Sequence, residues 1–177
     1  MKIEIRPITE ENASVLSIPN DPFLCEGRVV PLFDGSTWDH RIERFPESEV
    51  REECFPDENY SFDGMGEGFH GLAVYADGVC AGFAVLYEQW NRWLYLDNIL
   101  ISGRYRGMGL GSALVGACIE LAVSLDKIGV WAVCQDDNLR AAEFYFMNGF
   151  VLGGMDQPVY EGTKQEGKTD IYLYRRA

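Results

Sequence analysis

The chain has 177 residues, of which 47% are hydrophobic and 13% aromatic, so it can form one globular domain with a sizeable core. Its formal net charge is −13, from 28 acidic and 15 basic residues, and the first 70 residues hold 16 of the acids but only 6 of the bases. Such a surface repels nucleic acids and anionic lipids, and no apolar run is long enough to span a membrane. The composition therefore argues against nucleic-acid and membrane partners and favours cationic ligands, although the same charge also serves solubility.

The five cysteines are odd in number and widely spaced, they form no CxxC pair, and the chain has only two histidines. This pattern predicts neither a metal site nor a disulfide framework, and it favours the reducing environment of the cytoplasm. Cys118 and Cys134 lie among apolar residues, which favours buried thiols over a nucleophile. The first six residues alternate apolar and charged side chains, which is a strand pattern rather than the apolar core of a signal peptide.

The first third of the chain carries few signals of regular structure. Residues 1–6 are predicted to form a strand, whereas residues 20–68 contain scattered prolines and many acids and are expected to be irregular. Within that stretch, only residues 47–53 favour a short, highly charged helix. Glycines at three alternate positions, Gly64, Gly66 and Gly68, then predict a flexible turn.

A three-stranded antiparallel meander is predicted next. The apolar runs 72–76 and 79–86 are separated by Asp77-Gly78, a strong hairpin signal because both central positions of the turn need positive φ. A second polar break then leads to the third run, residues 93–101.

Helices and strands alternate in the rest of the chain. After the glycine-rich residues 102–111, apolar residues recur at helical spacing as far as Leu125. The order of strands, helix, strand, helix and strands predicts a mixed α/β domain with a central sheet. The later elements are a short buried strand at 130–134, a helix from Asn138 to a stop at Asn148-Gly149, and closing strands at 150–152 and 170–174.

The segment RGMGLGS, residues 106–112, joins the third meander strand to the first helix. Glycine lets backbone N–H groups approach a ligand, and a helix N-terminus attracts anions. Arg104 and Arg106 add the clustered positive charge, so a phosphate-bearing ligand is predicted here. A dinucleotide fold would need G-x-G-x-x-G within a βαβ unit, and a P-loop would need a lysine. A tight turn that simply requires glycine is the structural alternative.

Two motifs in a fixed order narrow the choice. They are Arg106-x-x-Gly109-x-Gly111 and, downstream, Asn138-x-x-Ala141-x-x-x-Tyr145-x-x-x-Gly149-Phe150. The pair resembles the acyl-CoA-binding motifs of the GNAT superfamily of N-acetyltransferases. The resemblance implies acetyl-CoA as cosubstrate, with the pyrophosphate on the glycine-rich loop and the pantetheine arm along a strand edge. The residues it assigns to the coenzyme are Ile99, Leu100, Ile101, Arg106, Gly107, Met108, Gly109, Leu110, Gly111, Ser112, Asn138 and Tyr145, where Asn138 also suits a helix N-cap.

The same resemblance implies the fold class α/β (α+β), with a mixed central sheet, an antiparallel meander, splayed central strands and flanking helices. It implies a single N-acetyltransferase domain over residues 1–177. Residues 1–70 would form an acidic region on the acceptor side, and residues 71–177 would form the acetyl-CoA-binding core.

Two residues are the catalytic candidates. By resemblance, Tyr145 protonates the departing thiolate, a role that a phenol of pKa about 10 suits; a core aromatic is the alternative. Asp97 would accept the proton of the attacking ammonium or hold the cation, and Glu88 is a weaker candidate. Strand alternation places Asp97 on one face with Tyr95, Ile99 and Ile101, unless a bulge intervenes.

A closer resemblance, to streptothricin acetyltransferases, covers nearly the whole chain. It rests on Pro22-Phe23-x-x-x-Gly27-Arg28-Val29-Val30-Pro31, Trp38, Trp90-Asn91-Arg92-x-x-Tyr95, Gln135-Asp136-x-Asn138, Phe144-Tyr145 and Val159-Tyr160. It implies a polycationic antibiotic as the amine acceptor, and Trp90, Asp97, Asn98 and Tyr160 as the residues that contact it.

The chain departs from that family at the carboxylates. Asp97-Asn98 stand where the family pattern has Glu-Asp, and Val133 stands where it has a further Glu. Another polyamine, an aminoglycoside-like amine or a protein amine is therefore an alternative acceptor. A non-catalytic acetyl-CoA-binding module is a second alternative, and a homodimer is possible because many proteins of this fold dimerise.

Overall fold

The computed structural model describes residues 1–177, and the chain forms two compact units. The first consists of Met1–Asp21, Phe55–Val130 and Arg176–Ala177, and the second of Pro22–Cys54 and Trp131–Arg175. The acidic N-terminal region is therefore divided between the two units. None of the helices has both the length and the apolar character that crossing a membrane would require.

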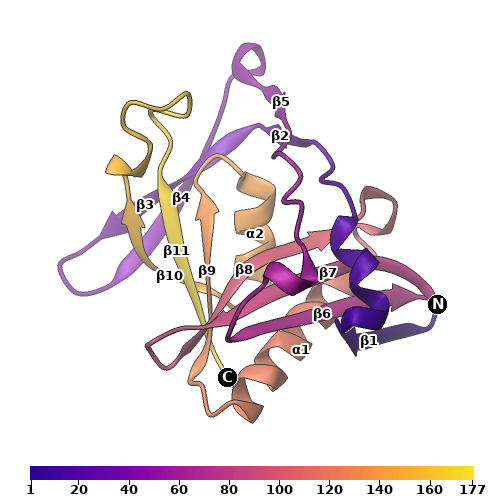
Figure 1. The fold of residues 1–177 in the computed structure, drawn as a ribbon. Coiled ribbons are helices and arrows are strands. Elements are labelled where there is room, and N and C mark those ends of the chain that lie inside the picture. Colours follow the sequence, from indigo (N-terminus) through magenta and orange to yellow (C-terminus); the bar gives the residue numbers. More distant parts are fainter. The chain divides into compact units, whose positions relative to one another are not determined.

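The first unit is built on four antiparallel strands in the order β1-β6-β7-β8 (Figure 1). The predicted Asp77-Gly78 turn is confirmed, because Ala76 pairs with Val79 and the two turn residues have φ values of 47° and 83°. The predicted meander strands are confirmed as well. The strands are β1 (Ile3–Pro7), β6 (Phe69–Ala76), β7 (Val79–Glu88) and β8 (Trp93–Ile101).

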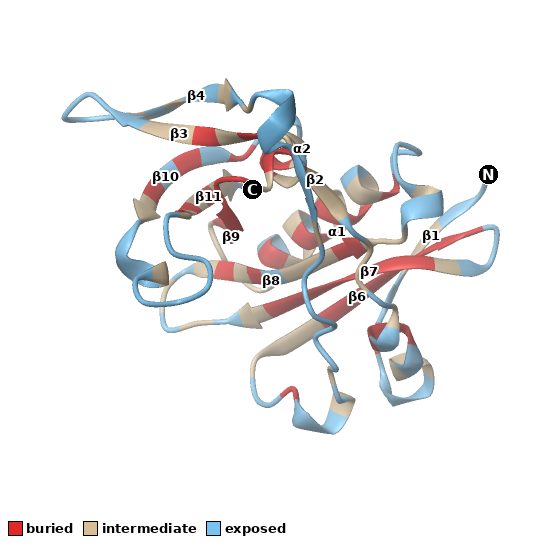
Figure 2. Ribbon diagram, turned by 90° about the horizontal axis from the view of Figure 1, so that it is seen from above, coloured by how far each residue is buried: buried red, intermediate tan, exposed pale blue.

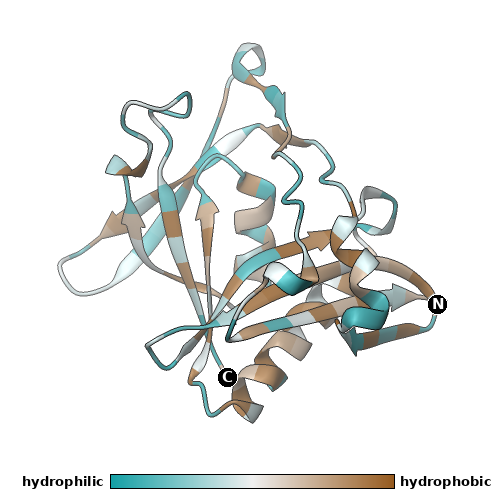
Figure 3. Cartoon of the chain, viewed as in Figure 1, coloured by the Kyte–Doolittle hydropathy of each residue, from teal (hydrophilic) through white to brown (hydrophobic).

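Apolar side chains cover both faces of this sheet. The helix α1 (Leu110–Ser124) packs on one face, and the 3-10 helix η1 (Glu10–Ser17) packs on the other. Buried residues accordingly concentrate in β6 and β7 and on the inner side of α1 (Figure 2), and apolar residues run along the same elements (Figure 3). The short 3-10 helices η3 (Phe62–Gly64) and η4 (Gly103–Tyr105) flank them.

A β-bulge interrupts β8 at Asp97. Val85 of β7 pairs with Asn98, but the next residue, Leu86, pairs with Leu96, so Asp97 has no partner in the ladder. An extra residue in one strand changes the face to which the following side chains point. The sequence-based expectation allowed for a bulge at this position, and the structure contains one.

The bulge changes the facing expected for Asp97. Residues paired across antiparallel strands share a face, and Leu100 pairs with Phe83 in the core beneath η1. The hydroxyl of Tyr60, whose ring packs edge-on against Phe83, reaches Asp97 on this same face. Ile99 pairs with Ala84 and lies on the opposite face. Because the bulge is present, Asp97 does not share a face with Ile99 and Ile101, as it would in a regular strand.

The two strands that carry this bulge approach closely at Gly82. A Cβ atom there would lie 2.1 Å from the Leu100 carbonyl oxygen and 2.7 Å from Ile101 Cδ1. Gly82→Ala should therefore push β7 and β8 apart and lower the free energy of unfolding by about 2–3 kcal/mol. Thermal unfolding would report this as a lower Tm. Gly116→Ala in α1 is the control, because nothing lies within 4 Å of its Cβ position. Equal melting of the two variants would contradict the close approach.

The second unit combines a group of strands, a helix and two small two-stranded sheets. The strands lie in the order β9-β11-β10, and β10 pairs with β11 in antiparallel fashion. The later strands and the second helix are confirmed where the sequence predicted them. They are β9 (Gly129–Gln135), α2 (Leu139–Met147), β10 (Val151–Asp156) and β11 (Asp170–Arg176). The unit also contains two pairs of antiparallel strands: β3 (Gly27–Phe33) with β4 (Trp38–Arg44), and β2 (Phe23–Cys25) with β5 (Arg51–Glu53).

These two-stranded sheets correct the expectation that residues 20–68 are irregular. The sequence concealed them because β4 is mostly exposed and charged, and because Pro31 lies inside β3. Only Glu47–Glu49 of the expected charged helix forms a 3-10 turn, whereas Arg51–Glu53 is a strand. The residues that it pairs with in β2 lie 26 to 30 positions away along the chain, from Cys25 with Arg51 to Phe23 with Glu53. Such long-range pairing leaves no local pattern.

Candidate functional site

The glycine-rich segment forms an exposed loop that leads directly into α1. Gly107 and Gly109 have φ values of +76° and +82°, which L side chains rarely adopt, and Gly109 is the N-cap of the helix. No side chain caps this N-terminus. Nothing lies within 4 Å of a Cβ placed at either glycine. The first backbone N–H groups of α1 therefore face an open approach, which fits a pyrophosphate group.

Arg106 is held at the start of this loop. Its Nε donates to the carbonyl of Ile101 at 3.0 Å, and its Nη2 lies 3.7 Å from Asp21 Oδ2. The same Asp21 oxygen accepts from the Gly103 backbone N–H at 2.7 Å. Arg104 is stacked over the Tyr105 ring, with its guanidinium carbon 4.8 Å from the ring centroid. The two predicted arginines thus lie on the same short segment as the glycines.

Asp97 and Asn98 lie at the bulge of β8. Asp97 is exposed, and its Oδ2 accepts a hydrogen bond of 2.9 Å from the Tyr60 hydroxyl. Burial raises the pKa of Tyr60 well above its ordinary value, so that phenol stays protonated and donates. Tyr60 was missed by the sequence reasoning, because a single tyrosine in an acidic segment without periodicity carries no motif.

Other acidic and aromatic candidates of the first unit lie at the turn between β7 and β8. Trp90 occupies this turn and is 97% exposed. Glu88 is engaged in ion pairs, 2.9 Å from Lys127 Nζ and 3.1 Å from His70 Nε2. These contacts lower the pKa of Glu88 and keep it ionised, which weakens it as a proton acceptor.

In the second unit, α2 presents Asn138 and Tyr145. Asn138 is the N-cap, and its side chain accepts from the Ala141 N–H at 3.4 Å, as its sequence position suggested. Tyr145 is buried, with its ring edge-on to Phe150 at 5.0 Å between centroids. This packing fixes the ring, which a proton donor requires.

Tyr160 lies within a polar network rather than at a free surface. Its hydroxyl donates to Asp170 Oδ1 at 2.6 Å and accepts from Gln135 Nε2 at 2.9 Å. Burial, together with the Asp170 carboxylate, raises the pKa of Tyr160, so the phenol stays neutral. Both hydrogen bonds anchor the loop between β10 and β11.

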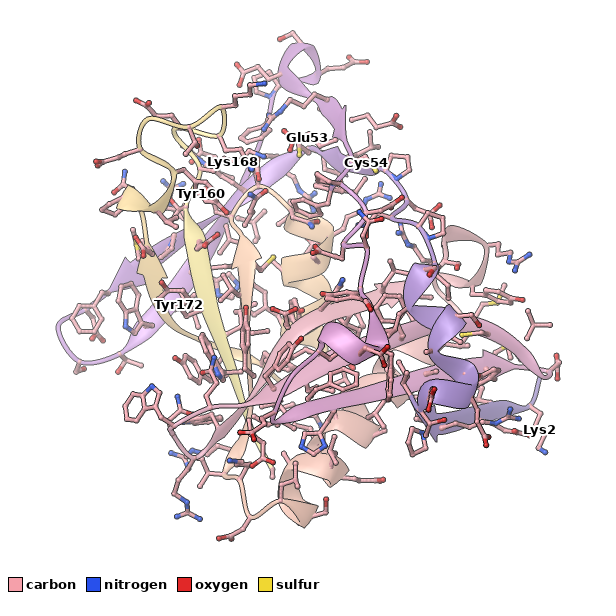
Figure 4. All side chains as sticks on the ribbon, viewed as in Figure 1. Lys2, Glu53, Cys54, Tyr160, Lys168 and Tyr172 are labelled. Atoms are coloured by element: carbon pink, nitrogen blue, oxygen red, sulfur yellow. The ribbon has the colours of Figure 1, made fainter.

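A cavity of about 310 Å³ opens beside this network. Lys168 and Glu53, labelled in Figure 4, form an ion pair of 2.5 Å at its wall, and Lys168 also lies 3.2 Å from Asp137. Arg51 contacts the same Asp137 at 2.6 Å. The two cations neutralise these acids, so the cluster is an ion network that ties β5 to the β10–β11 loop. None of the residues predicted to contact coenzyme or acceptor lines the cavity.

Comparison with known proteins places these features in a family. Residues 36–150 match the acetyltransferase (GNAT) family. Over 170 residues the chain is 28% identical to streptothricin acetyltransferase A of Bacillus subtilis (strain 168), which covers 96% of this chain and 98% of that protein. Over 103 residues it is 34% identical to streptothricin acetyltransferase of Streptomyces lavendulae, which covers 58% of this chain and 54% of that protein.

Solved structures show the same fold. The crystal structure of nourseothricin acetyltransferase matches with a TM-score of 0.79 and 25% identity over 99% of both chains. A protein of Bacillus anthracis str. Ames, assigned as a streptothricin acetyltransferase and solved in complex with acetyl coenzyme A, matches with a TM-score of 0.87 and 23% identity over 100% of this chain and 99% of that chain. The predicted fold class and the cosubstrate acetyl-CoA are confirmed. The chain belongs to the acetyltransferase (GNAT) family and is an acetyl-CoA-dependent N-acetyltransferase.

Proposed function

We propose that this enzyme acetylates a primary amine of a streptothricin-type antibiotic and thereby confers resistance to it. The observation that carries this proposal is the likeness to the Bacillus subtilis relative, which extends over 96% of the chain and so includes the acidic N-terminal region as well as the coenzyme motifs. The net charge of −13 supports a polycationic acceptor, because such a surface concentrates cations. The exposed Asp97 offers a carboxylate for an ammonium group.

Residues 106–112, with Asn138, are proposed to bind the coenzyme. The uncapped N-terminus of α1 and the two left-handed glycines support the pyrophosphate assignment. Ile99–Ile101 would pair through their backbone with the amide groups of the pantetheine arm. In this view, residues 71–177 carry the coenzyme machinery of a single N-acetyltransferase domain, and acids within residues 1–70 serve the acceptor.

The proposed reaction forms one C–N bond and breaks one C–S bond. Asp97 holds the substrate ammonium and accepts its proton, which leaves the nitrogen lone pair free to attack the thioester carbonyl. A backbone N–H within Ile99–Ile101 stabilises the negative charge that builds on the carbonyl oxygen. As the tetrahedral intermediate collapses, Tyr145 gives its proton to the departing thiolate. The products are the N-acetylated amine and free coenzyme A.

The acceptor is proposed to contact Trp90, Asn98 and Tyr160 in addition to Asp97. Trp90 has an exposed indole that suits stacking on a cation. The hydroxyl of Tyr160 is already engaged, so its ring is the part that would contact a ligand. All five cysteines are free thiols, which supports a cytoplasmic enzyme.

An amine panel tests the proposal. Streptothricin, other polyamines, aminoglycosides and lysine peptides would each be incubated with acetyl-CoA while the release of free thiol is followed. We expect kcat/KM for streptothricin to exceed that for a simple monoamine by about 10–100-fold, because several ammonium groups meet the acidic surface. A higher kcat/KM for another amine of the panel would identify that amine, and not streptothricin, as the acceptor. Coenzyme binding without turnover of any amine would instead identify a binding module.

A further inference from the structure

Tyr60 occupies a position next to Asp97 that no sequence motif marks. It comes from the segment between β5 and β6, and its ring packs edge-on against Phe83, with centroids 6.2 Å apart. This packing directs the hydroxyl to Oδ2 of Asp97, at 2.9 Å. The phenol therefore donates its proton to Asp97.

The direction of this donation is fixed by the surroundings. Because burial keeps the Tyr60 phenol protonated across the range in which enzymes work, Tyr60 remains a donor. An ionised carboxylate can only accept, so Asp97 cannot reverse the bond.

Asp97 needs such a partner because of where it lies. It is exposed and occupies the bulge, where the β-ladder gives its backbone no pairing across to β7. A free carboxylate at such a position samples several rotamers, and ordering it when a substrate binds costs entropy. The hydrogen bond to Oδ2 restricts the side chain beforehand and leaves Oδ1 to meet a ligand.

We propose that Tyr60 is a positioning residue that orients Asp97 toward the ammonium group of the acceptor amine. This inference rests on the proposed role of Asp97 in the reaction. Tyr60 does not touch the reacting atoms; it holds one carboxylate oxygen so that the other faces the ammonium. An acceptor with a primary ammonium group would bind to a carboxylate that is already oriented toward it.

A double-mutant cycle tests the proposal. Tyr60→Phe keeps the ring and removes only the hydroxyl, and we expect kcat/KM for the amine to fall about 10-fold, the effect of losing one hydrogen bond to a charged group. The KM for acetyl-CoA and the melting temperature should stay unchanged. In an Asp97→Ala background, the same Tyr60→Phe change should cost less than about twofold, because its effect acts through Asp97.

Tyr87→Phe is the matched control. Tyr87 lies on a neighbouring strand, and its hydroxyl donates to Met65 Sδ at 3.8 Å rather than to Asp97. We expect this variant to retain its activity within about twofold. If the effects of Tyr60→Phe and Asp97→Ala simply multiply, or if Tyr60→Phe alone is silent, the positioning role is overturned while the role of Asp97 stands. If Asp97→Ala is itself silent, the proposed role of Asp97 fails as well.

Discussion

Tyr145→Phe is expected to lower kcat about 100-fold while the KM for acetyl-CoA changes by less than about twofold. Proton transfer by a positioned side chain contributes about 10²–10⁴-fold to a rate, and the variant removes only the hydroxyl that would supply the proton. Tyr145 is buried with its ring against Phe150, and phenylalanine would keep that packing. Initial rates measured at saturating amine, with acetyl-CoA varied, separate the two constants.

Tyr172→Phe serves as the control for this experiment. It also removes one tyrosine hydroxyl from the second unit, one that donates to Asp156 Oδ2 at 3.3 Å. We expect a kcat within about twofold of the unmodified enzyme. An unchanged kcat for Tyr145→Phe would assign Tyr145 to the core alone, and another group would then have to protonate the thiolate.

Arg106→Glu is expected to weaken acetyl-CoA binding about 100-fold. The substitution replaces a cation with an anion at the loop proposed for the pyrophosphate, and each charge-assisted hydrogen bond to a phosphate contributes about 1.5–3 kcal/mol. The carboxylate of Asp21, 3.7 Å from Arg106 in the unmodified protein, adds to the repulsion. Arg106→Gln removes the charge without reversing it and should weaken binding by only about 10-fold.

Calorimetric titration with coenzyme A would measure both variants. Arg41→Glu is the charge-matched control, since Arg41 is exposed and paired with Glu43 at 3.7 Å on the β3–β4 hairpin. Its affinity for coenzyme A should match that of the unmodified enzyme within about twofold. Arg106→Glu with unaltered affinity would rule out the loop as the pyrophosphate site.

Local chemistry made part of this structure predictable. Asp77, Gly78 and Gly149 have positive φ at the positions where the sequence predicted a turn and the end of a helix. Two or three adjacent residues are enough to indicate such a backbone conformation, so it can be predicted locally. The uncapped, glycine-rich start of α1 was predictable for the same reason. The features that define the loop proposed to bind the coenzyme are therefore local ones.

Features that depend on distant parts of the chain were not predictable. The pairing of Phe23–Cys25 with Arg51–Glu53 is set by contacts far apart in sequence. The hydrogen bond from Tyr60 to Asp97 joins residues 37 positions apart. Residue identity alone marks neither, since an acidic strand and a lone tyrosine suit many environments.

The bulge at Asp97 has a consequence for engineering this enzyme. Side chains alternate regularly between the two faces of the sheet before Asp97 and again after it, but the alternation is shifted by one residue at Asp97. Deleting Asp97 would join Leu96 directly to Asn98 and remove the bulge, while Leu100 would stay paired with Phe83 and Ile99 with Ala84. A relative that lacks this extra residue is therefore one position out of step with this chain on one side of the bulge. A chimaera that exchanges this strand with a relative must therefore be aligned on the bulge. An alignment that matches only the glycine-rich loop would place residues 93–96 on the wrong face of the sheet wherever the relative lacks the extra residue.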